Sequence, residues 1–295
     1  MRHRRLRDLL CYGLLVLPAA CGGDTKTTAP RAREKPLVFV VNYPLKYFAE
    51  RIGGAEVEVR FPVPGDIDPA FWKPSDEDIA AFQTADVILL NGANYAKWLS
   101  YSSLPASRCV VTFRGQPIAI EDAAAHKHGP RGKHDHGATA FTTWLDLQEA
   151  IAQARAVKDA LLRFAPDADK RFESLKRDLD RLDRKLVENA PKVPLVASHP
   201  VYRYLTRRYG LSVESVHFEP DEVPDEEGWK ELEAILRRHP AKWMLWEDDP
   251  RAETKARLER LGVRSVVYAA CANVPRSDDF LAVLRKNVNA LTSIR

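Results

Sequence analysis

Four of the eight histidines of this chain stand within one short run, HKHGPRGKHDH. They are His126, His128, His134 and His136. Much of the imidazole is unprotonated at neutral pH and can then ligate a metal ion. The glycines and the proline predict a loop, and the histidine-rich composition favours metal binding over packing. We interpret the run as a metal-binding loop; the alternative is a solvated loop with incidental metal affinity.

A second group of side chains that could do chemistry follows apolar, β-rich runs. The group comprises an imidazole, carboxylates and a thiol, which are the ligand types of zinc and related metals. A site made of the histidine and the carboxylates is chemically reasonable, whereas the thiol would favour a softer metal. The alternative is that the carboxylates are solvated, capping or paired and that the histidine is structural. The residues are Asp66, Asp68, His199, Glu219, Glu247 and Cys271.

These residues must be positioned by strands and helices, and the chain carries two similar series of them. In the first half, buried-strand patterns alternate with helical patterns. Strands are predicted at 37–43, 57–63, 86–92 and 108–113, and helical segments at 45–54, 75–85 and 95–99. The second half repeats the order. Strands are predicted at 193–199, 211–218, 242–248 and 263–269, and helices at 201–210, 225–239, 253–262 and 278–294. The alternation predicts an α/β fold with a doubly wound parallel sheet in each half.

One long helix is predicted between the halves, at 167–190. Its apolar side chains recur at helical spacing with charges elsewhere, so it presents one apolar stripe. The stripe consists of Phe172, Leu175, Leu179, Leu182 and Leu186. We expect a rigid strut that joins two lobes, at 37–166 and 191–295. Since ligands of doubly wound sheets bind beyond the carboxyl ends of the strands, the expected site is the cleft between the lobes.

The N-terminus has the pattern of an export signal. A basic stretch precedes a short apolar run, which is too short to span a bilayer, and then comes Cys21. Residues 1–20 are predicted to be a signal peptide, Cys21 the lipidated first mature residue, and 21–36 a polar tether. The alternative is ordinary cleavage nearby, giving a free protein. Cys109 and Cys271 would remain in an oxidising compartment, as one disulfide or as two separately buried thiols.

The bulk composition is that of a soluble globular protein. The formal net charge is +4, and part of it lies in the first seven residues. The remainder is nearly balanced, which gives no electrostatic case for binding nucleic acid. No glycine-rich phosphate loop or zinc-protease motif is present. Because no nucleophile or acid–base set converges, we expect the protein not to be an enzyme.

Five segments resemble the zinc- and manganese-binding lipoproteins of bacterial ABC importers (periplasmic solute-binding protein family 9). In the order and spacing of that family they are NYPLKYFAERIGG, VPGDIDPAFWKPSDEDIAAFQTADVILLNGANYAKWL, TTWLDLQEAIAQA, SHPVYRYLTRRYGL and DDFLAVLRKN. The resemblance covers nearly the whole mature chain. It implies two lobes joined by a rigid helix, with one divalent metal held in the cleft by three histidines and a carboxylate. It also implies that zinc-specific members carry a His/Asp-rich loop where His126–His136 lies.

This sequence departs from the implied ligand set at three of four positions. Ala70 stands for the first histidine, Thr142 for the second, and Ala269 is aligned with the carboxylate; only His199 is retained. A lone imidazole binds a divalent ion weakly, so the substitutes considered are Asp68, Glu219, Glu247 and Cys271.

The resulting hypothesis is the extracytoplasmic solute-binding component of a metal ABC importer, a monomer held to the membrane by lipid. The cargo is zinc, with manganese and copper as alternatives, and the partner is a permease in the cytoplasmic membrane. The competing hypothesis is a lipoprotein that lost the cleft metal and serves a structural or surface-interaction role.

Overall fold

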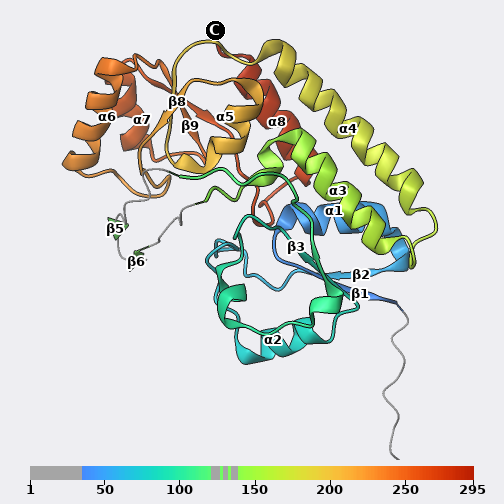
Figure 1. Cartoon of the computed structure of the whole chain (residues 1–295). Coiled ribbons are helices and arrows are strands. Elements are labelled where there is room, and N and C mark those ends of the chain that lie inside the picture. Colours follow the sequence, from blue (N-terminus) through green and yellow to red (C-terminus); the bar gives the residue numbers. More distant parts are fainter. Residues whose placement is uncertain (1–34, 121–126, 129–131, 134–138) are drawn as a thin grey trace, which may run out of the picture. The chain divides into compact units, whose positions relative to one another are not determined.

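Two four-stranded parallel sheets form the framework of the computed structural model (Figure 1). It describes residues 35–120, 127–128, 132–133 and 139–295. The expected signal peptide, Cys21, nearly all of the tether, and His126, His134 and His136 lie outside the described residues. His128 belongs to β5 (Lys127–His128), which pairs antiparallel with β6 (Gly132–Lys133).

The first sheet has the strand order β2-β1-β3-β4. Its strands are β1 (Leu37–Val40), β2 (Glu58–Arg60), β3 (Val87–Leu90) and β4 (Cys109–Val111). The two central strands are almost entirely apolar and buried, as parallel strands covered on both faces must be.

The second sheet has the order β10-β9-β7-β8. Its strands are β7 (Leu195–Ala197), β8 (Val213–Ser215), β9 (Trp243–Trp246) and β10 (Arg264–Val267). Starting from β8, the strands of this lobe lie in the order second, first, third and fourth, which is the order of the first sheet. The two sheets therefore share one strand order, and the predicted α/β class with a parallel sheet in each half is confirmed.

Several of the helices begin where a side chain caps their free backbone N–H groups. Ser75 and Asp78 form a capping box at α2, and Asp146, Asp225 and Asp279 cap α3, α6 and α8. The α-helices are α1 (Tyr43–Gly53), α2 (Asp76–Gln83), α3 (Leu147–Leu161), α4 (Ala168–Asn189), α5 (Arg203–Tyr209), α6 (Glu226–Arg238), α7 (Ala252–Arg260) and α8 (Phe280–Thr292).

Two helical segments differ from the sequence expectation. The segment predicted at 95–99 is a short 3₁₀ turn at Lys97–Tyr101. The 15-residue helix α3 was not predicted as an element, although it supplies much of the first lobe's buried face. Its alanine-rich pattern makes the apolar stripe less obvious than the leucine stripe of α4.

Helix α4 is the predicted strut. Phe172, Leu175, Leu179 and Leu186 are at most 1% exposed, and the helix packs against α1, α3 and α8 (Figure 1). The last helix, α8, returns to the first lobe, where the Phe280 ring meets Tyr47 and Phe48 at 5.5 Å between centroids. Residues 35–295 consequently form one compact unit. Among the residues described, no helix is long and apolar enough to cross a membrane.

Candidate metal centre

His199 is a buried polar side chain just beyond the end of a strand. It follows β7 and precedes a 3₁₀ turn, Pro200–Tyr202, and it is 5% exposed. Its Nε2 lies 3.3 Å from Oε1 of Glu219, and its Nδ1 lies 3.5 Å from Oε1 of Glu247. The ring is therefore held between two carboxylates.

The sheet order explains this grouping. β7 lies between β8 and β9, and all three strands are parallel. Glu219 follows β8 and Glu247 follows β9, so the carboxyl ends of three adjacent strands deliver the three side chains to one edge. This is the point where the strand order reverses, which is where open α/β sheets bind their ligands.

The electrostatics of the group favour positive charge at this edge. Burial lowers the pKa of His199, but the Glu219 contact and the charges of Glu247, Glu219 and Asp68 outweigh it and raise the pKa above 6.5. Burial raises the pKa of Glu247 to about 7; His199 opposes this shift, and Asp68 and Glu219 add to it. A divalent cation can take the place of a proton among these carboxylates, because either positive charge offsets the repulsion between them.

His217 is a further member of this edge that was not among the ligands expected from the sequence. Its ring lies edge-on to that of His199, with the centroids 5.8 Å apart. The signal that could have found it is its spacing, because it stands two residues before Glu219 on the same segment.

A cavity of about 990 Å³ opens beside this edge, between the loop at 65–69 and the segment at 265–278. Asp66, Asp68, Glu247 and Cys271 all line it. Oδ1 of Asp68 accepts a hydrogen bond of 2.9 Å from the backbone N–H of Ala70, which fixes the carboxylate at the start of a turn.

Cys271 is the least suited of the candidate ligands. Burial, together with the charge of Asp279, raises the pKa of its thiol to about 12, whereas a metal ligand must be the thiolate. Its backbone is in the left-handed region, at φ 57°. Cys109 and Cys271 are both free thiols, so the alternative of a disulfide between them is not realised.

The three positions at which the family resemblance implied metal ligands serve packing here. Ala70 is fully buried. The hydroxyl of Thr142 donates a hydrogen bond to the Val201 carbonyl. The backbone of Ala269 exchanges hydrogen bonds of 3.1 and 2.8 Å with the side chain of Asn287. Of these contacts, the hydrogen bond from Thr142 to Val201 joins the two lobes, whereas the Ala269–Asn287 pair lies within the second lobe.

Among the described residues, no group of three or more His, Cys, Asp or Glu side chains is gathered closely enough to hold a metal ion. The geometry of His199 gives the reason, since its two carboxylates lie at different ring nitrogens and do not face one point. A metal centre at this edge requires the side chains to rearrange.

The first lobe ends its corresponding strands in uncharged amides. Asn42 Nδ2 donates to Asn91 Oδ1 at 3.0 Å, and Gln153 Nε2 donates to the same oxygen at 3.1 Å. All three residues are buried. This network offers no charge to a cation, so the second lobe and the 65–69 loop carry the candidate site.

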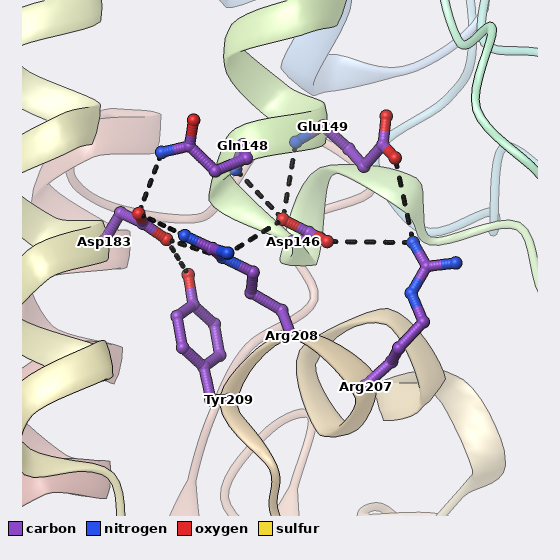
Figure 2. Close-up of polar contacts among 7 residues, drawn as sticks. All are labelled: Asp146, Gln148, Glu149, Asp183, Arg207, Arg208 and Tyr209. Atoms are coloured by element: carbon purple, nitrogen blue, oxygen red, sulfur yellow. Dashed lines mark hydrogen bonds and ion pairs between the residues drawn. The ribbon is translucent and has the colours of Figure 1, made fainter.

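A second polar cluster, which the sequence did not predict, joins the lobes at α4 (Figure 2). We call it the Asp183 cluster; its members are Asp183 on α4, Gln148 on α3, and Arg208 and Tyr209 on α5. Asp183 is 5% exposed and accepts hydrogen bonds from all three partners. Its position four residues after Leu179 places it on the apolar face, and a charge at such a position is the signal that could have identified it.

The architecture is that of two α/β lobes joined by one long helix. The sequence profile of the ZnuA family (zinc-uptake complex component A, periplasmic) matches residues 38–294. The chain therefore belongs to the ZnuA family, whose members are extracytoplasmic, non-enzymatic solute-binding proteins that deliver metal to an ABC permease. Membership makes it the metal-binding component of a ZnuA-type uptake system.

Individual relatives are distant. The high-affinity zinc uptake system protein ZnuA of Bacillus subtilis is 23% identical over 297 residues, covering 94% of this chain and 93% of the relative. The metal-dependent lipoprotein YcdH of Bacillus subtilis has a similar structure, with a TM-score of 0.73 and 19% identity over 88% of this chain and 99% of that one. The Zn(II)-bound ZnuA-like domain of Streptococcus pneumoniae AdcA also gives 0.73, with 18% identity over 88% and 98% of the two chains.

Proposed function

We propose that this protein binds a zinc ion at the cavity edge formed by His199, Glu247 and Asp68, and presents it to an ABC permease. The observation that carries the proposal is the placement of His199 between Glu219 and Glu247, at 3.3 and 3.5 Å, where the strand order of the second sheet reverses. An imidazole with carboxylates is a donor set that zinc accepts. Manganese is the alternative cargo, because carboxylate-rich sites suit harder ions, and copper is a further one.

The site forms when the metal replaces the proton that His199 and Glu247 attract. Rotation of the Glu247 and Asp68 side chains in the cavity brings their oxygens toward the imidazole, and water fills the remaining position. Glu219 stays on the other ring nitrogen, where a hydrogen bond to it orients the imidazole. Cys271 is the least suited of the candidate ligands, because burial raises the pKa of its thiol to about 12.

Lipidated Cys21 anchors the protein outside the cytoplasmic membrane, and residues 21–36 form the tether. The loop with His126, His128, His134 and His136 gives a separate place where metal is captured. The protein has two lobes, at 37–166 and 191–295, on either side of the helix at 167–190. The protein acts as a monomer.

The test is calorimetric titration of the stripped protein with zinc, manganese and copper. Substitution His199→Ala and substitution Glu247→Gln should each weaken zinc binding at least about tenfold, since each removes a ligand. The matched control is Glu253→Gln, an exposed glutamate on α7, which should leave the affinity unchanged. Deletion of 126–136 tests the loop: loss of all binding in that variant alone would place the metal outside the cavity.

A second candidate function is favoured by Ala70, Thr142 and Ala269. These three positions carry no ligand atoms in their side chains beyond one engaged hydroxyl. In this alternative the protein has given up the cleft metal and acts as a structural or surface-interaction lipoprotein. It predicts that no metal binds more tightly than about micromolar, which corresponds to roughly −8 kcal/mol.

A further inference from the structure

Asp183 is a buried anion with an unusually complete set of donors. Its carboxylate accepts from Gln148 Nε2 at 2.8 Å, from Arg208 Nε at 3.1 Å and Nη2 at 2.7 Å, and from the Tyr209 hydroxyl at 2.9 Å. The two-point contact with Arg208 fixes direction as well as distance, because the guanidinium is planar. Figure 2 shows these donors converging on one carboxylate.

The donors come from helices of both lobes. Gln148 lies in the first turn of α3, while Arg208 and Tyr209 end α5. Asp146, the capping residue of α3, lies 3.8 Å from Arg208 Nε and 3.7 Å from Arg207 Nη2. The C-terminal end of α5 is thereby held against both α3 and α4.

The other end of α5 leads directly to the candidate metal centre. The chain passes from His199 through the 3₁₀ turn Pro200–Tyr202 into α5 with no intervening loop. Helix α5 has seven residues, which spans roughly 10 Å at 1.5 Å per residue. Its two ends therefore lie close together, in an interior that is packed closely enough to transmit strain.

Side chains along this segment prevent it from adjusting independently. Tyr202 donates its hydroxyl to the Tyr268 carbonyl at 2.9 Å. Tyr204 is fully buried, with its ring edge-on to Phe113 at 5.6 Å. The segment is therefore held at both ends, by Tyr202 and Tyr204 beside His199 and by Arg208 and Tyr209 on Asp183.

From this arrangement we infer that Asp183 is a positioning residue for the metal centre. It fixes α5, and through α5 it sets where the His199 imidazole lies relative to Glu219, Glu247 and the cavity. The effect on zinc affinity rests on the proposed function; the effect on the His199 ring does not. Asp183 itself is not a ligand of the metal.

The experiment compares Asp183→Asn with Asp180→Asn in the full mature chain. Asp180 is the matched control because it lies on the same helix and pairs only locally with Lys176, at 2.6 Å. Two quantities are measured at a temperature where each variant is fully folded: the Kd for zinc, and the imidazole resonances of His199 in a ¹⁵N-histidine spectrum. The His199 signals are assigned with His199→Ala.

Asp183→Asn is expected to weaken zinc binding about tenfold, the scale seen when outer hydrogen bonds to a metal ligand are removed, and to shift the His199 resonances. Asp180→Asn should change neither. A purely structural role would lower the unfolding temperature of Asp183→Asn while leaving both quantities as in the wild type, and that result overturns the inference.

The experiment also covers two further cases, a wild type that binds no metal and a variant that does not fold. If the wild type binds no metal, the proposed function fails, and the His199 resonances still decide whether Asp183 positions the ring. If Asp183→Asn does not fold, Tyr209→Phe removes one hydrogen bond and keeps the aromatic ring; a His199 spectrum identical to the wild type then overturns the inference.

Discussion

Asp183→Asn should also lower the free energy of unfolding by about 2 kcal/mol at pH 7. Removing one partner of a buried ion pair costs about 3–5 kcal/mol. The Arg208 side chain is 32% exposed, so it recovers part of its hydration and the cost falls below that range. The Asn oxygen still accepts from Tyr209 or Gln148, which reduces the loss further.

The pH dependence of this difference has a defined sign. Burial raises the pKa of Asp183, but hydrogen bonds from Arg208, Gln148 and Tyr209 outweigh it and hold the pKa below 3.8. An unfolded Asp has a pKa of about 3.9. Because the folded pKa is depressed, the stabilisation is complete above the unfolded pKa and is lost as the pH falls through the folded one.

Urea unfolding followed by circular dichroism, at steps from pH 8 to pH 2.5, measures the difference between wild type and variant. We expect it to be constant from pH 8 to about pH 5 and to shrink below about pH 4. Burial raises the pKa of Asp146, which acts in the opposite direction, but the subtraction largely cancels it. A difference below about 0.5 kcal/mol at pH 7, or one that grows in acid, would refute the role given to Asp183.

Three other outcomes follow from single contacts. Trp144→Phe removes the hydrogen bond of 2.7 Å from Nε1 to the Ala270 carbonyl at a fully buried site; it should cost about 1–3 kcal/mol in urea unfolding, and an unchanged midpoint contradicts this. Leu175→Ala on the fully buried face of α4 should cost about 2–5 kcal/mol by the same assay, whereas less than about 1 kcal/mol would mean that the stripe is not core. Cys271, whose thiol pKa burial raises to about 12, should react with iodoacetamide at pH 8 at least about a hundredfold more slowly folded than unfolded, as read by mass spectrometry; equal rates would count against its burial.

The strand framework was predictable because buried parallel strands and leucine stripes leave strong patterns. The runs at 37–43 and 193–199 contain β1 and β7, and the stripe at 167–190 contains α4. Helix α3 was missed as an element because its alanines lie on both sides, with Ala150 and Ala154 buried and Ala152 exposed, which blurs the apolar stripe. Boundaries were overestimated, since apolar residues continue past the last ladder hydrogen bond.

The candidate site was only partly predictable. The predicted strand ends indicated His199, Glu219 and Glu247, because the carboxyl ends of parallel strands lie at the same edge of a sheet. The sequence could not show that the two glutamates lie at different nitrogens of the ring, which depends on side-chain torsions. Nor could it reveal the Asp183 cluster, whose members are distant in sequence and meet only after both lobes pack on α4.

The most direct test of the central claim is a calorimetric zinc titration of the stripped mature protein. The wild type is compared with Glu247→Gln and with the control Glu253→Gln. The account predicts one zinc ion bound more tightly than about micromolar by the wild type, at least about tenfold weaker binding by Glu247→Gln, and unchanged binding by Glu253→Gln. Equal affinities in all three proteins, or no binding tighter than about micromolar by the wild type, would contradict a metal centre at His199.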